Sequence, residues 1–355
     1  MEETLKKMTR NLIAAVAGGL LASAAQAQSS VTMYGVVDAG IEYVSHAGTT
    51  GSGSAYRVKS GNSAASRWGL RGKEDLGGGL SAIFVLENGF FVDTGMAAQG
   101  GRLFGRKAFV GIAGPWGQIT LGRQYNILGD IFIPLDTTRY ATYSVLSHDT
   151  HFSGIADNTI KYTGNFGNLT LSAMYSAGYD STISGGSEVP GAPRVGQEIG
   201  AGASYTAGRL GMALVYDQRR GTSLATANSV ERRYAAGLIY TSGPFIAVAG
   251  YRYLQGDLAT PGLRSDLYWL GASYSIMPAL TLRAGIYRTD RRASDDSATS
   301  YTLQAVYSLS KRTDVFLLGS YMDNRGRSKF GVANATTAAP GVGQTGIIAG
   351  IKHIF

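Results

Sequence analysis

The sequence predicts an all-β protein, an antiparallel transmembrane β-barrel of roughly 16 strands. Apolar and polar residues alternate with a period of two along most of the 355 residues, and tight turns alternate with long loops. The chain also ends in a strand-like run from Gly346 to Phe355. Strands with one apolar and one polar face need two environments, which in a membrane barrel are lipid outside and water inside.

The first residues have the three parts of a secretory signal. A basic segment that ends at Arg10 precedes the apolar stretch from Leu12 to Ala25, and Ala25-Gln26-Ala27 fits a small-x-small cleavage site. The apolar stretch is shorter than the roughly 20 residues that a membrane-spanning helix needs. We therefore expect a signal peptide at 1–27 and one barrel domain at 28–355. Cleavage removes three basic and two acidic side chains, so the formal net charge of +8 becomes +7.

The composition excludes several kinds of protein. The absence of cysteine rules out a disulfide framework and thiolate metal sites, and the sequence suggests no cofactor. Beyond the signal there is no apolar run long enough for a transmembrane helix. The basic surplus lacks the basic helix or aromatic-basic clusters of nucleic-acid-binding proteins. We interpret the surplus charge as the lining of an aqueous space.

Three runs show the strand pattern clearly. Residues 169–176 place apolar side chains at odd positions, and 301–308 repeat the pattern with one departure at Val306. In 280–286, Arg283 lies on the face opposite four apolar residues. Many tyrosines stand near the ends of such runs, where an apolar ring with a hydroxyl suits a membrane interface. This position favours a membrane barrel over a soluble sandwich.

The connections have the layout of a bacterial outer-membrane barrel, with tight turns on one side and long loops on the other. The expected short periplasmic turns lie at 76–79, 114–117, 207–209, 242–244, 277–279 and 311–314. The expected long extracellular loops lie at 45–65, 91–102, 126–157, 179–197, 219–231, 255–265, 290–299 and 323–345. A barrel of about 16 strands leaves an aqueous channel, whereas about eight would be filled by side chains. We expect Phe355 to end the strand that closes the barrel on its first strand, because closure leaves no exposed edge.

Five segments resemble the general porins of Gram-negative bacteria, most closely the betaproteobacterial and neisserial branch. They are Ser30–Gly40, Ser66–Gly77, Arg106–Gly111, Thr120–Gln124 and Lys352–Phe355. The resemblance implies a homotrimer of 16-stranded barrels, surrounded by the lipids of the outer membrane. Each barrel would let small hydrophilic solutes and ions diffuse passively through its pore. The resemblance also implies that the third long loop folds inward and narrows the pore.

The third loop, Asn126 to Asp157, is the expected constriction. Its apolar stretch, 131–135, is unusual for a freely solvated loop, and Asp130 and Asp136 flank that stretch. We expect these two aspartates to form an acidic face toward the pore. The Pro-Glu-Phe-Gly motif of enteric porins is absent, and a loop that caps the barrel from outside is the alternative.

Porins place a cluster of basic residues on the wall opposite this loop, and strand parity nominates its members. Trp68 and Leu70 would face lipid or a neighbouring subunit, which turns Arg67 and Arg71 inward. The same rule turns Arg106 inward but sends Lys107 outward. The candidates are Arg67, Arg71, Arg106, Arg123, Lys161 and Arg283. Of these, Arg123 shares parity with apolar residues and would reach the lumen only through a bulge.

Acids on one side and arginines on the other would create a transverse field across the water-filled constriction. A basic surplus there raises the local concentration of anions, so we expect a weak to moderate anion preference.

Three other functions remain open. A substrate-specific channel would show saturable conductance with one solute. A barrel enzyme could use His148 and His151 as a weak metal pair or a catalytic base, although no nucleophile stands beside them in the sequence, and we expect no enzyme. The long loops, such as the Gly/Ser/Thr-rich Gly48–Gly53, could give the protein the role of an adhesin or a receptor.

Overall fold

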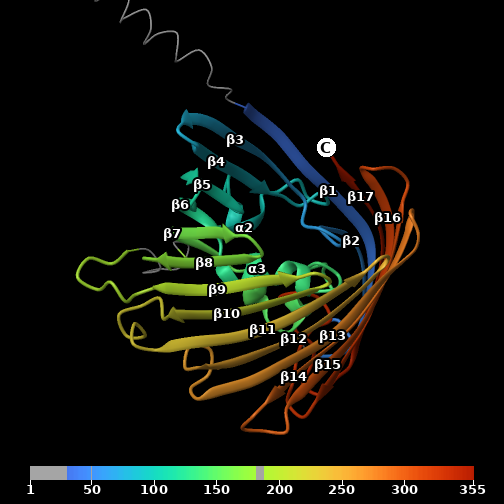
Figure 1. Cartoon of the computed structure of the whole chain (residues 1–355). Coiled ribbons are helices and arrows are strands. Elements are labelled where there is room, and N and C mark those ends of the chain that lie inside the picture. The colour runs from blue at the N-terminus through green and yellow to red at the C-terminus, as the bar shows by residue number, and fades with distance from the viewer. Residues whose placement is uncertain (1–29, 49, 181–187) are drawn as a thin grey trace, which may run out of the picture.

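The computed structural model describes residues 30–48, 50–180 and 188–355, and the expected signal peptide lies outside these ranges. The chain forms one closed antiparallel sheet (Figure 1). Strand β1 (Ser30–Ser45) pairs with β17 (Gln344–Ile354) and so closes the barrel. The other strands are β2 (Ser54–Ser60), β3 (Arg67–Gly77), β4 (Leu80–Gly89), β5 (Lys107–Gly114), β6 (Gly117–Tyr125), β7 (Ile155–Phe166), β8 (Leu169–Ser176), β9 (Glu198–Ala207), β10 (Leu210–Arg220), β11 (Val230–Ser242), β12 (Phe245–Gly256), β13 (Leu263–Met277), β14 (Leu280–Arg291), β15 (Ser297–Ser308) and β16 (Thr313–Arg325).

The seventeen strands occupy sixteen positions around the barrel. β2 pairs with the second half of β1, from Ala39 to Ser45, and β3 pairs with the first half, from Ser30 to Val36. β2 and β3 therefore act as one interrupted strand, and the predicted 16-stranded barrel is confirmed. β2 lies inside the range that the sequence analysis assigned to the first long loop.

The interruption between β2 and β3, residues 61–66, is held by one carboxylate. Asp38 of β1 accepts hydrogen bonds from the backbone N–H groups of Asn62, Ser63 and Ala64, at 2.8, 2.9 and 2.9 Å. The carbonyl of Asn62 in turn accepts from the N–H of Thr142 in the third long loop. The break thus connects the barrel wall to the loop inside it.

The two faces of the strands differ as the period-two pattern predicts. The outer face carries exposed apolar side chains such as Val31, Leu214 and Leu303, while inner positions carry buried polar ones such as Thr120 and Gln304. Apolar atoms on the outside suit lipid, where a charge would cost about 2–4 kcal/mol at the bilayer midplane. Exposed tyrosines also stand on the outer face, among them Tyr175, Tyr205, Tyr240, Tyr274, Tyr307 and Tyr321.

The carboxy-terminal residue lies in the closing seam, beside β1 (Figure 1). Phe355 and Gly35 exchange two backbone hydrogen bonds, of 3.0 and 3.1 Å. The Phe355 ring covers Gly35 so closely that a Cβ at that glycine would lie 2.2 Å from the ring. Glycine at position 35 therefore lets the last residue pack flat on the first strand.

In the part of the chain that the structure describes, helical structure is confined to short segments. α2 (Ala98–Gly101) lies between β4 and β5, and four further turns belong to the third long loop. Within the described ranges, no helix combines the length and the apolar character needed to cross a membrane.

Candidate functional site

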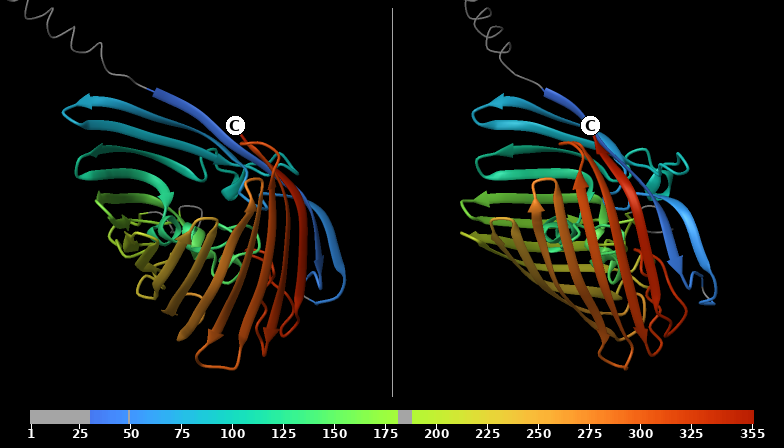
Figure 2. Two further views of the ribbon diagram at one scale, coloured as in Figure 1. Left: turned by 45° about the vertical axis from the view of Figure 1, so that its right-hand side comes forward. Right: turned by 90° about the vertical axis from the view of Figure 1, so that its right-hand side faces the viewer.

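The third long loop, between β6 and β7, folds into the barrel. It consists of α3 (Ile127–Phe132) and three 3₁₀ turns, η2 (Ile133–Leu135), η3 (Val145–Ser147) and η4 (Thr150–Ser153). In both views of Figure 2 these segments, drawn in green, lie inside the ring of strands. The side chain of Asn126 caps α3 by accepting a hydrogen bond from the N–H of Gly129 at 2.7 Å.

The apolar side of this loop packs against the barrel wall. Its buried side chains form one cluster with residues of β8 and β10–β14, namely Ile127, Leu128, Phe132, Leu135 and Phe152 with Met174, Val215, Val248, Leu267, Trp269 and Tyr287. This explains the apolar stretch in the loop sequence. The alternative that the loop only caps the barrel from outside does not agree with this burial.

Three wall residues also hold the loop by hydrogen bonds. Trp269 Nε1 of β13 donates to the carbonyl of Leu135 at 2.8 Å, and the Tyr287 hydroxyl of β14 donates to Asp136 Oδ1 at 2.6 Å. Further along the wall, the hydroxyl of Tyr143 donates to Glu42 Oε1 of β1 at 2.8 Å. The loop therefore contacts the wall from β13 and β14 as far as β1.

Glycines on the inner face of the wall make room for the loop. A Cβ at Gly271 would lie 1.6 Å from Thr137 Oγ1, and one at Gly202 would lie 2.5 Å from Ile131. A side chain at either position would therefore force the loop residue to shift. Inward-facing glycines in strands opposite an apolar loop were the sequence signal for this docking, and the prediction of an inward-folded loop did not depend on them.

Asp130 and Lys161, both predicted site residues, lie together in an ion pair. Lys161 Nζ donates to Asp130 Oδ2 at 2.6 Å and to the carbonyl of Tyr125 at 2.9 Å. Both side chains line a cavity of about 550 Å³ with Lys107, whose Nζ lies 5.2 Å from the centre of the Tyr125 ring. The acid on the loop is thus neutralised by one lysine, and a second lysine lies beside the pair.

Asp136 does not face the pore, in contrast to the sequence-based expectation. Its side chain is buried at 1% exposure, and it accepts hydrogen bonds from Tyr287, from the Thr138 hydroxyl at 2.9 Å and from the N–H of Tyr140 at 2.8 Å. Burial raises the pKa of this carboxyl, although these hydrogen bonds oppose the shift. The reason for the difference is docking: the loop side that bears Asp136 turns toward β14.

Three residues after Asp136, the loop presents Arg139 to the lumen. Arg139 and Tyr140 have left-handed backbone conformations, with φ of 55° and 63°, and the Arg139 side chain is exposed. Arg139 is the only lysine or arginine among residues 126–157. That isolation was the signal in the sequence for a basic residue facing the pore, whereas the prediction for the loop rested on its acids alone.

The inner face of β3–β5 carries the predicted arginines 67, 71 and 106. Arg106 Nε and Arg67 Nε lie 2.8 and 3.7 Å from the Glu87 carboxylate, which also accepts from the Tyr34 hydroxyl at 2.9 Å. The guanidinium of Arg71 lies 5.3 Å from the centre of the Tyr34 ring. Two arginines therefore share one carboxylate, and within the described residues Arg71 has no ion pair.

Lys107 also lies on the inner face, so its predicted outward position is wrong. β5 begins at Lys107, which is the cross-strand partner of Glu87, and Arg106 precedes the strand. Because Arg106 lies outside the strand, its side chain need not alternate with that of Lys107. Arg106 therefore also turns inward, where it donates to the Tyr125 hydroxyl. The parity failed because Phe109, which the prediction turned outward, faces inward and lines the same cavity as Lys107, while Val110 and Ile112 are the exposed residues of β5.

The bulge considered for Arg123 is present, as a register shift between Gly122 and Gln124. The Arg123 guanidinium donates to Asp157 Oδ1 at 2.6 Å and to the carbonyl of Gly105 at 2.7 Å. It is thus engaged at the loop ends of β6 and β7, apart from the lysines near Asp130. Arg283 of β14 faces inward as parity predicts and donates to Gln304 Oε1 at 3.1 Å.

The two loop histidines do not form a pair, because they contact different strands. The ring nitrogens of His148 lie 2.9 Å from Thr289 Oγ1 and 2.8 Å from Ser300 Oγ. Burial lowers the pKa of His148 to about 3, so its ring is neutral. Ser300 is 2% exposed, which leaves a substrate no access to this contact.

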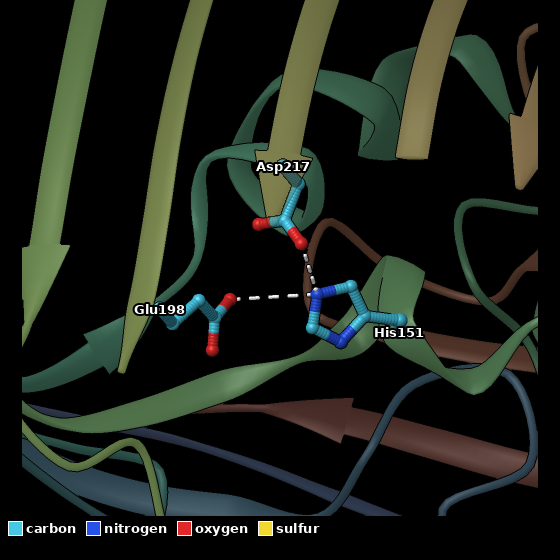
Figure 3. Close-up of side chains that lie close together, drawn as sticks. All are labelled: His151, Glu198 and Asp217. Carbon is cyan, nitrogen blue, oxygen red and sulfur yellow. Dashed lines mark hydrogen bonds and ion pairs between the residues drawn. The ribbon is translucent and has the colours of Figure 1, made fainter. Parts of the chain in front are cut away.

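His151 fastens the loop to β9 and β10 (Figure 3). Its Nε2 lies 2.7 Å from Asp217 Oδ1 and 3.4 Å from Glu198 Oε1. Burial alone would lower the pKa of His151, but the carboxylates outweigh burial and raise it. The three candidate ligand atoms lie within 4.8 Å of one another, which could hold a metal ion. The donation of Nε2 to Asp217 instead supports an ion pair that anchors the loop.

Comparison with known proteins agrees with this architecture. A family described as "Gram-negative porin" matches residues 12–327. An outer membrane porin protein of Bordetella pertussis is 31% identical over 400 residues, covering 98% of this chain and all of that protein. Outer membrane porin protein 32 of Delftia acidovorans is 32% identical over 369 residues, with the same coverage of both chains. The solved anion-selective porin from Comamonas acidovorans superposes with a TM-score of 0.79 at 28% identity, covering 92% of this chain and all of that one. The chain therefore belongs to the Gram-negative porins, which form channels as integral β-barrels of the bacterial outer membrane.

Proposed function

We propose that this porin is a passive diffusion channel for small hydrophilic solutes and ions with a weak to moderate preference for anions. The observation that carries the proposal is uncompensated positive charge on the lumen side. Arg71, Lys107, Arg139 and Arg283 have no ion pair among the described residues. The acids that face the same space, Glu87 and Asp130, are each already paired with basic side chains.

The physical consequence is a positive potential in a narrow aqueous space with low-dielectric walls. Such a potential concentrates anions and repels cations, and salt weakens it once the Debye length falls below the pore dimensions. The sequence-based hypothesis placed two acids on one side of a transverse field. Asp130 is neutralised by Lys161 and Asp136 is buried, so neither supplies a free negative charge to that field. The Comamonas acidovorans porin, which is described as anion-selective, supports the same sign of selectivity.

The test is the zero-current potential of the refolded protein in a planar bilayer under a KCl gradient at low ionic strength. We expect a potential of the sign that chloride permeation produces, and a smaller one at high salt. A potential of the opposite sign at low salt would refute the anion preference. Absence of measurable conductance would refute the channel itself.

We also propose that the native assembly is a homotrimer embedded in outer-membrane lipid. The support is the resemblance to the general porins, which form homotrimers. Chemical cross-linking of the protein in detergent should give a largest product of three chains, and conductance should close in three equal steps. A largest product of one chain, with single closures, would contradict the trimer.

A further inference from the structure

A small cavity lies between the third loop and the inner wall of β11–β14. It encloses about 210 Å³, and its polar lining includes Asp136, Thr137 and Arg139 of the loop and Ser273, Thr281 and Arg283 of the wall. Pockets for drug-sized molecules usually measure about 300–1,000 Å³, so this one suits a small ion with a few water molecules. Its polar groups are two guanidinium groups, several hydroxyls and the carboxylate of Asp136. Both oxygens of that carboxylate already accept hydrogen bonds, from the Tyr287 and Thr138 hydroxyls and from the N–H of Tyr140.

Neither arginine is in an ion pair within the described ranges. Both line the same cavity, so their like charges repel each other. The two acids that attract Arg283 are committed elsewhere. Asp136 accepts from Tyr287, and Asp314 lies 2.8 Å from Lys352 Nζ. A bound anion would relieve this repulsion.

The structure holds the Arg283 guanidinium and the backbone of Arg139 in place. Arg283 donates to Gln304, and Arg139 projects from the left-handed turn that Asp136 stabilises. Because Tyr287 and Arg283 both belong to β14, the hydrogen bond from Tyr287 to Asp136 docks the turn beside Arg283. Side chains fixed before binding lose less entropy when the ligand arrives.

We propose that Arg139 and Arg283 form a binding site for a small tetrahedral oxyanion, a phosphate or a sulfate group. Guanidinium forks bind such groups through paired charge-assisted hydrogen bonds, and the hydroxyls of Thr137, Ser273 and Thr281 supply further donors. Chloride offers no such geometry, so the site distinguishes oxyanions from halides. The inference rests on the proposed anion-preferring channel and adds the class of anion that the channel retains.

The experiment measures how inorganic phosphate inhibits the chloride current through single channels, at constant pH and ionic strength. In the wild-type protein, phosphate should reduce the chloride current saturably. Arg139→Gln and Arg283→Gln should each raise the half-inhibitory phosphate concentration about tenfold or more, since each removes charge-assisted hydrogen bonds. Arg283→Lys should raise it by an intermediate factor, because an ammonium keeps the charge but not the fork.

The matched control is Arg71→Gln, which removes an unpaired arginine from the wall at β3. It should weaken anion preference in KCl and leave the half-inhibitory phosphate concentration within about twofold of the wild-type value. Conductance steps in KCl show that each variant is folded. Inorganic sulfate, tested in the same way, should compete with phosphate.

Two results would overturn the site: an anion-preferring wild-type channel whose chloride current phosphate does not inhibit saturably, or an equal loss of inhibition in Arg71→Gln. Either result would leave the proposed anion preference intact. A wild-type channel that prefers cations in KCl would instead remove the proposed function, and the site with it.

Discussion

Tyr287 of β14 donates a hydrogen bond of 2.6 Å to Asp136 in the third loop, and both side chains are buried. This bond joins the constricting loop to the wall strand that also bears Arg283. It shows why Asp136 does not line the pore, and why the next basic residue, Arg139, can.

Replacing Tyr287 by Phe should weaken the docking of the loop. The variant leaves the buried Asp136 carboxylate without one donor, which costs about 1–3 kcal/mol in the free energy of unfolding. We expect a lower unfolding midpoint in urea and larger fluctuations of the open-channel current. Tyr307→Phe, on the exposed outer face, is the control. Equal destabilisation by both variants would contradict the proposed role of the bond.

Gly271→Ala should displace the loop, because the new Cβ would lie 1.6 Å from Thr137 Oγ1. Overpacking of this kind costs about 1–3 kcal/mol. The nearest atom to a Cβ at Gly319 is 3.9 Å away, so Gly319→Ala is a control of identical chemistry. Urea unfolding and single-channel conductance should change in the first variant only. An unchanged Gly271→Ala protein would mean that the loop is not packed at this glycine.

Stability should depend on pH through His151. Its pKa in the folded protein is raised, so its ion pair stabilises the loop fully below the unfolded value of about 6.5, and this contribution is lost as pH rises through the folded value. His151→Gln leaves Asp217 and Glu198 without their cation and should cost about 3–5 kcal/mol near pH 6. The difference in unfolding free energy between wild type and variant should shrink at high pH.

The exposed His46 provides the control for this experiment. His46→Asn should show the wild-type pH profile, since asparagine tolerates the left-handed backbone at this position, where φ is 47°. A difference between wild type and His151→Gln that stays constant from pH 5 to pH 9 would show that His151 acts by packing alone.

Asp130→Asn should increase anion preference, because it releases the charge of Lys161 beside Lys107. A unit charge about 8 Å from a permeating ion contributes about 0.5 kcal/mol in water, and salt at about 0.1 M roughly halves this. Because chloride and potassium respond with opposite sign, the ratio of their permeabilities should change roughly twofold. The zero-current potential in a KCl gradient measures this ratio. Asp295→Asn, which removes an exposed acid from the loop after β14, should leave it unchanged. A ratio that falls in Asp130→Asn would contradict the electrostatic account.

The sequence predicted the barrel well because a period of two depends only on the backbone. Every regular strand must place Arg67, Arg71, Lys161 and Arg283 on the face opposite its apolar residues. The same rule failed for Lys107, because β5 turns the aromatic Phe109 inward together with Lys107. It could not place Arg123, which lies at a bulge.

The orientation of the third loop was not predictable from its own residues. It depends on partners more than a hundred residues away, such as Trp269 for Leu135 and Tyr287 for Asp136. Those partners decide that Asp136 is buried and Arg139 exposed. A search of the loop for any isolated charge, together with inward glycines such as Gly271, would have brought the prediction nearer.

The most direct test of the central claim is the selectivity of a variant in which Arg71, Arg139 and Arg283 are all replaced by Gln. The zero-current potential under a KCl gradient at low salt should show a chloride-to-potassium permeability ratio lower than that of the wild type by roughly threefold to tenfold, because three unpaired charges are removed. An unchanged ratio in channels of normal conductance would show that these arginines do not set the selectivity, and the account of the lumen would be wrong.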